Sequence, residues 1–72
     1  MQFTTRNDLE NWIADNYYVT ADSEGTPTES LIAGWVNAAD TEEDRVKAGG
    51  APMPEREFLE LAYSEYRNMG YN

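Results

Sequence analysis

Apolar side chains recur every three or four residues in three segments of this 72-residue chain. That spacing places them on one face of an α-helix, whereas a half-buried strand alternates apolar and polar residues. Proline bounds two of the segments, because Pro27 and Pro54 are tolerated only in the first turn of a helix. The pattern predicts helices over about residues 6–17, 27–39 and 54–69.

The first two helices carry recognisable start signals. Thr5 can accept a hydrogen bond from the backbone of the first helical turn, and Asp8 follows three residues later as an imperfect capping box. Thr26 precedes Pro27, which suits the first helical position. Glu29 follows at the positive end of the helix dipole. These signals predict helices that begin near residues 6 and 27.

A charged segment lies between the second and third helices. Residues 40–44 hold four acidic side chains, and Gly49 and Gly50 follow them. Acids stabilise the N-terminus of a helix, and glycine commonly follows its C-terminus. The segment therefore predicts a separate short helix or turn over about residues 42–48.

The second helix has two uncharged faces of different character. One face is apolar, with Leu31, Ile32, Trp35, Val36 and Ala39. The other is small, with Ser30, Ala33, Gly34 and Asn37. Because small side chains let another backbone approach closely, this helix is expected at the centre of the fold.

The size of the chain and its residue types limit the architecture. A chain this short forms one domain. It has no cysteine and no histidine, so neither a disulfide nor a zinc site of the usual kind can stabilise it. We therefore predict a single acidic helical domain over residues 1–72. Its fold class is all-α, a small bundle of three main helices plus a short fourth helix or turn.

The chain shows no membrane or export signal. No apolar run approaches the about 20 residues that a membrane span needs. Residues 1–5 lack the basic start and apolar stretch of a signal peptide. We expect a cytoplasmic protein, in the host cytoplasm if it is viral.

Net charge is the most informative property for function. The chain carries 14 acidic and five basic residues, for a net charge of −9, spread over both halves. Nucleic acid and anionic lipid repel such a chain, because binding to phosphate needs positive charge. The partner expected is a larger protein with a basic surface, such as a nucleic-acid-binding protein, and neither nucleic acid nor a membrane directly. The alternative is that the charge only keeps the protein soluble.

Catalytic and metal-binding patterns are missing from the sequence. A serine or cysteine nucleophile needs a base, most often histidine, and none is present. Lys47, the only lysine, lies among acids that favour its charged form. Asp22, Glu24 and Gly25 resemble a calcium loop in residue types but lack its spacing. We expect no enzymatic activity, no cofactor and no metal.

One short motif resembles a known family. Glu29-Ser30-Leu31 opens the second helix, and the helix order is similar to that of acyl and peptidyl carrier proteins, which are small acidic helical bundles. The resemblance implies Ser30 as the attachment site. Two departures stand against it: Glu29 replaces the Asp or Gly that usually precedes the serine, and no glycine lies in the expected place upstream.

Two groups of acids form the candidate binding surface. They are Glu42, Glu43 and Asp44 before the glycine pair, and Glu55, Glu57 and Glu60 at the start of the last helix. A DNA mimic presents carboxylates where phosphates would lie and reaches a basic channel by electrostatic steering. By analogy at the level of a class, phage-encoded anti-defence inhibitors are often small, acidic and lysine-poor.

Aromatic residues supply a second candidate surface. Nine aromatic side chains are more than a core this small can fully enclose. Tyrosine and tryptophan are enriched at the energetic centres of protein interfaces. Tyr18 and Tyr63 lie at the edges of their apolar faces, so we expect them to be exposed and to contact a partner.

These observations predict a non-enzymatic acidic protein-binding domain. Its most concrete form is an inhibitor that occupies a basic or nucleic-acid-binding surface of a larger protein. The alternatives are a small structural or regulatory adaptor, and a carrier-like protein. The sequence leaves open whether the chain forms a homo-oligomer.

Overall fold

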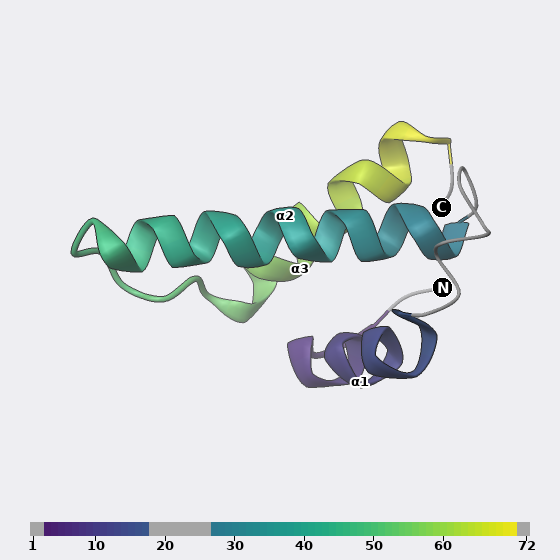
Figure 1. Ribbon diagram of the computed structural model, residues 1–72, viewed down its shortest axis with the longest axis horizontal. Helices are drawn as coiled ribbons and strands as arrows, with labels where there is room; N and C mark the ends of the chain where they lie inside the picture. The colour runs from purple at the N-terminus through teal and green to yellow at the C-terminus, as the bar shows by residue number, and fades with distance from the viewer. Residues whose placement is uncertain (1–2, 18–26, 71–72) are drawn as a thin grey trace.

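A computed structural model describes residues 3–17 and 27–70 of the chain. Within them it contains three helices and no strand: α1 (Arg6–Asn16), α2 (Pro27–Lys47) and α3 (Glu55–Asn68). The all-α class is confirmed, and each predicted main helix is present (Figure 1). Tyr18, the loop residues Asp22, Glu24 and Gly25, and Thr26 lie outside the described residues.

The start of α1 follows the predicted capping pattern. Thr5 has extended backbone angles, φ −128° and ψ 156°, and its hydroxyl oxygen accepts a hydrogen bond from the backbone N–H of Asp8 at 3.1 Å. One of the unpaired N–H groups of the first turn is thereby satisfied. Asp8 itself lies in that first turn, where its charge opposes the helix dipole.

The second helix is longer than predicted, because α2 continues without interruption to Lys47. Residues 42–48 are largely helical, as expected, but the break before them was wrong. No glycine or proline lies between Gly34 and Gly49, so nothing in the backbone ends the helix there. An ion pair between Lys47 and Glu43 at 2.8 Å, one helical turn apart, supports this last part of α2.

The end of α2 is a Schellman motif. Gly49 has a φ of +91°, and its N–H donates to the carbonyl of Val46 at 3.0 Å. The N–H of Gly50 donates to the carbonyl of Arg45 at 2.9 Å. Glycine suits this left-handed position because it has no Cβ. The chain then turns back beneath α2 and enters α3 (Figure 1).

The α2–α3 contact depends on the small face of α2. A Cβ atom placed on Gly34 would lie 1.9 Å from the backbone oxygen of Ala62 in α3, so the two helices meet at backbone distance. Ser30 and Ala38, one turn away on either side, are also buried. The prediction of a close approach is confirmed, although Ala33 and Asn37 at the edge of that face are exposed.

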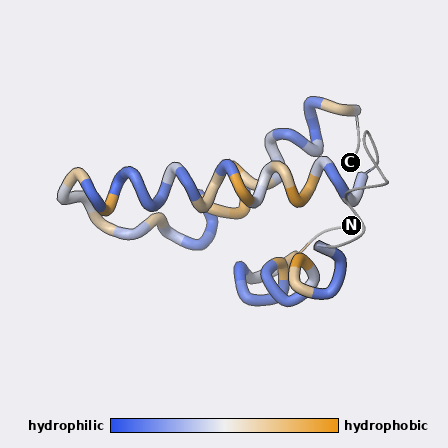
Figure 2. The backbone as a smooth tube through the Cα atoms, viewed as in Figure 1, coloured by the Kyte–Doolittle hydropathy of each residue, from blue (hydrophilic) through white to orange (hydrophobic). Residues whose placement is uncertain are grey.

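The core lies between all three helices. Apolar residues recur between polar ones along the helices (Figure 2). The buried apolar residues are Leu9, Ile13, Leu31, Ile32, Ala38, Met53, Phe58, Ala62, Tyr63 and Tyr66. Trp12 and Trp35 pack against this core but are only partly buried. Val36, predicted on the apolar face of the second helix, is exposed.

None of the helices in the described part of the chain has the length and apolar character required to cross a membrane.

Candidate protein-binding surface

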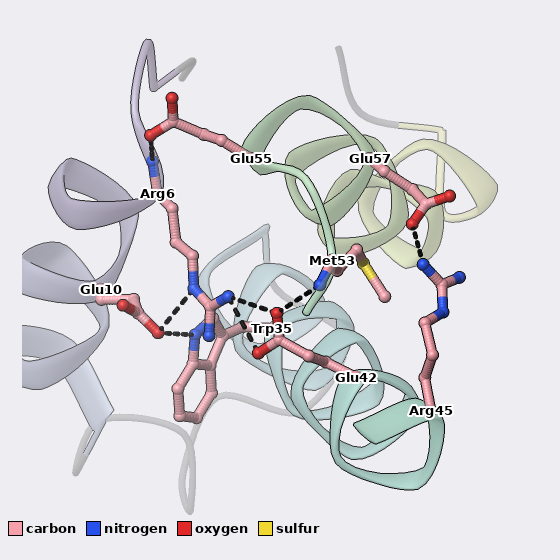
Figure 3. A network of polar contacts seen from close by, with 8 residues as sticks. All are labelled: Arg6, Glu10, Trp35, Glu42, Arg45, Met53, Glu55 and Glu57. Carbon is pink, nitrogen blue, oxygen red and sulfur yellow. Dashed lines mark hydrogen bonds and ion pairs between the residues drawn. The ribbon is translucent and has the colours of Figure 1, made fainter. Parts of the chain in front are cut away.

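Glu42, which belongs to the first predicted acidic group, is bonded to other parts of the chain. Its carboxylate accepts from the Arg6 guanidinium at 3.0 and 2.9 Å and from the backbone N–H of Met53 at 2.9 Å. Its side chain is only 17% exposed. Figure 3 shows Glu42 pointing inward at the meeting point of the three helices. Glu42 is therefore bonded within the fold of the free protein and is not a freely exposed carboxylate.

The Arg6 side chain joins α1 to the other two helices. Its Nε lies 3.3 Å from Glu10, and its guanidinium carbon lies 3.7 Å from the centre of the Phe58 ring. Glu10 also accepts from the indole N–H of Trp35 at 3.1 Å. The hydrogen bond from Arg6 holds the pKa of Glu42 below its ordinary value, and the same bond raises the pKa of Arg6.

Two glutamates of the second group are also bonded within the chain. Glu55 accepts from the backbone N–H of Arg6 at 2.8 Å. Glu57 pairs with Arg45 at 2.6 Å, which ties the start of α3 to the end of α2. Both glutamates are nevertheless exposed. Their charges therefore still face solvent.

Glu43 and Glu60 form the two most exposed ion pairs among the described residues. Each pairs with a cation four residues along its own helix, Lys47 at 2.8 Å and Arg56 at 3.7 Å. Lys47 lowers the pKa of Glu43. Exposed pairs of this kind contribute little to stability, because water competes for both charges. A basic partner can therefore take over either carboxylate at little cost.

Asp44 is the predicted acid whose side chain makes neither an ion pair nor a hydrogen bond among the described residues. Asp40, which preceded the predicted group, is equally exposed and unpaired there. Residues three and four apart are neighbours on a helix, so Asp40, Glu43 and Asp44 share the outer face of α2. We name these three residues the outer acidic face. The sequence contained the signal for Asp40, since it lies in the same acidic run.

The expected exposure of Tyr63 was wrong. Tyr63 is buried, and its hydroxyl accepts from the backbone N–H of Phe3 at 2.7 Å. Burial raises the pKa of this hydroxyl. Phe3 thus covers an edge that helical periodicity had left open. Because Tyr63 is buried, it does not support the predicted aromatic surface. Tyr18 lies outside the described residues.

Ser30 is inaccessible in the folded protein. It is 1% exposed, in the contact between α2 and α3, and its hydroxyl has no hydrogen-bond partner among the described residues. An enzyme that attaches a prosthetic arm needs access to the serine hydroxyl. The geometry therefore argues against the carrier-like interpretation and favours a packing role for Ser30.

We expect Glu42→Gln to lower the free energy of unfolding at neutral pH. We also expect that free energy to change less with pH in the variant than in the parent protein. The folded-state pKa of Glu42 is depressed below its ordinary 4.5, so its contribution is present above that value and is lost as pH falls through the folded pKa. Urea unfolding between about pH 7 and pH 2.5 measures this. Glu60→Gln, in an exposed pair, is the control, and identical pH profiles for both variants would contradict the structural role of Glu42.

In the part of the chain that the structure describes, no three His, Cys, Asp or Glu side chains are arranged so that they could hold a metal ion. Chemically, the surface can offer carboxylates to cations and hydrogen-bond donors. Comparison with protein-family models, curated proteins and solved structures found no match for this chain.

Proposed function

We propose that this protein is a non-enzymatic acidic binding domain that occupies a basic surface of a larger protein. The observation that carries the proposal is the outer acidic face of α2, whose three carboxylates are exposed on one side of one helix. The exposed Glu57 and Glu60 of α3 add to the negative charge. A nucleic-acid-binding surface is the most concrete partner, because its basic groups are spaced to meet phosphates.

The distribution of the cations supports this proposal. Four of the five basic residues form ion pairs, and Arg67 has its guanidinium carbon 5.6 Å from the centre of the Tyr63 ring. No basic side chain therefore pairs with Asp40 or Asp44 in the described residues. Excess negative charge attracts a basic partner from a distance and raises its association rate.

An inhibitory role follows if the occupied surface is one that binds nucleic acid. The protein would then compete with DNA or RNA for the same basic groups, as a phage-encoded anti-defence inhibitor does. The competing proposal is an adaptor whose charge serves only solubility. The two differ in one respect, which is whether binding depends on where the acids lie or only on their number.

We expect Asp40→Asn with Asp44→Asn to weaken binding to a basic probe about 30-fold, since each close charge contributes about 1 kcal/mol in water. The probe is a fluorescent peptide of alternating lysine and glycine, followed by anisotropy. Asp15→Asn with Glu65→Gln is the matched control, because it removes the same charge from exposed positions on α1 and α3. We expect that control to change the affinity less than about twofold.

Equal losses in the two double variants would contradict the proposal and leave net charge as the only determinant. A second arm adds duplex DNA, which should compete for the peptide and release the protein. Circular dichroism of both variants checks that the helices remain, as expected for exposed positions.

A further inference from the structure

The guanidinium of Arg6 occupies a site with the features of an arginine receptor. Two carboxylates, from Glu10 in α1 and Glu42 in α2, contact its nitrogens at 2.9 to 3.3 Å. The guanidinium carbon lies over the ring of Phe58 in α3, 3.7 Å from the ring centre. Figure 3 shows both carboxylates turned toward the same guanidinium. Charge, hydrogen-bond acceptors and an aromatic face are the three features by which proteins recognise arginine.

The two carboxylates are also held by groups other than Arg6. The indole N–H of Trp35 fixes Glu10 at 3.1 Å, and the backbone N–H of Met53 fixes Glu42 at 2.9 Å. Phe58 is fully buried in the core and cannot turn away. The site therefore keeps its shape when the Arg6 side chain leaves, and such preorganisation lowers the cost of binding a replacement.

The site is open to solvent on one side. The Arg6 side chain is 29% exposed, and Arg6 is the first residue of α1. Its side chain can swing outward by rotation about its own bonds while α1 stays in place. This exposed side is the one from which an outside guanidinium would reach Glu42 and Phe58.

We propose that Glu10, Glu42 and Phe58 form a guanidinium-binding site that Arg6 fills in the free protein and that an arginine of a bound partner takes over. The source of that arginine rests on the proposed function, which requires a basic partner. Arg6 then acts as an internal competitor, and a partner displaces it only when the rest of its surface is also bound. Lysine fits this site poorly, because a compact ammonium neither stacks on the ring nor contacts two carboxylates in one plane.

The site itself is tested by chemical rescue, without any partner. Arg6→Ala should lower the Tm, and ethylguanidinium should raise it again by about 9 °C at a tenfold excess over its Kd. Ethylammonium at the same concentration controls for salt and should not restore it. Arg6→Ala combined with Glu42→Gln should lose the rescue. Equal effects of the two cations, or rescue that survives Glu42→Gln, would overturn the proposal.

An alternative readout and a second variant complete this experiment. If Arg6→Ala does not fold in buffer, the return of helical circular dichroism on addition of ethylguanidinium becomes the readout, and its absence counts against the site. Arg6→Lys, which keeps the charge, should be rescued in the same way, because lysine fills the site poorly.

The exchange with a partner is tested with two peptides of equal charge, one of alternating arginine and glycine and one of alternating lysine and glycine. Arg6→Ala empties the site. The ratio of its affinity for the arginine peptide to its affinity for the lysine peptide should therefore be about ten times the same ratio in Arg56→Ala. Arg56 is 92% exposed, and its removal changes the net charge equally. Equal preferences in the two variants would overturn the exchange. If neither peptide binds any variant, the proposed function fails, while the rescue experiment still decides whether the guanidinium site exists.

Discussion

Gly34→Ala is expected to destabilise the protein by about 3 kcal/mol, although alanine is the better helix former by about 1 kcal/mol. The added Cβ would lie 1.9 Å from the oxygen and 2.9 Å from the carbonyl carbon of Ala62. Both are backbone atoms of α3, so no side chain can rotate to make room. The two helices must separate, and the buried contacts beside them, including those of Leu31, loosen together.

Urea unfolding followed by circular dichroism measures this loss. Asn37→Ala, on the exposed side of the same helix, serves as the control and should change the free energy of unfolding by less than about 0.5 kcal/mol. A Gly34→Ala variant as stable as the parent would show that α2 and α3 do not meet at backbone distance.

Phe58→Ala is expected to cost about 3–5 kcal/mol, as is usual for a fully buried phenylalanine. The total stability of a 72-residue domain is about 4–11 kcal/mol, so this one change removes much of it. Two losses coincide here. The cavity lies among the core side chains of all three helices, and the Arg6 guanidinium loses the ring against which it packs at 3.7 Å.

Phe58→Leu separates the two contributions. Leucine keeps most of the apolar volume but has no aromatic face, so we expect a smaller loss together with weaker rescue of Arg6→Ala by ethylguanidinium. Thermal unfolding gives the stability of each variant. Met69→Ala, at an exposed apolar side chain, is the control. A loss at Phe58 no larger than at Met69 would contradict the position of this ring in the core.

Local signals predicted most of the fold. The cap at Thr5, proline at the start of α2 and glycine at its end each act within one helical turn, so the sequence alone reveals them. The same locality explains the one misplaced boundary. Acids at residues 40–44 fit both the start of a new helix and the exposed face of a continuing one, and only tertiary contacts decide between the two.

Long-range contacts decided the parts that the sequence did not predict. Arg6 and Glu42 are 36 positions apart, and Phe3 and Tyr63 are 60 apart, so neither pair is visible as a local pattern. Each contact engages a residue of the predicted binding surface within the fold. Glu42 is only 17% exposed where it pairs with Arg6, and Tyr63 is buried where its hydroxyl accepts from Phe3.

The candidate surface was therefore only partly predictable. Composition identified the acidic groups, and helical spacing placed Glu57 and Glu60 away from the core, where the structure also has them. The sequence could not separate carboxylates that hold the fold from those that face solvent with no cation. That distinction depends on which acid each of the five bases reaches in three dimensions.

The salt dependence of binding to the lysine–glycine peptide tests the proposed function most directly. Its affinity for the parent protein is measured at about 20 mM and about 200 mM salt, where screening lengths differ severalfold. We expect a steep loss with salt in the parent and in Asp15→Asn with Glu65→Gln. We expect a clearly shallower loss when Asp40 and Asp44 are both replaced by asparagine. The same steep dependence in all three proteins would contradict a binding role for the outer acidic face.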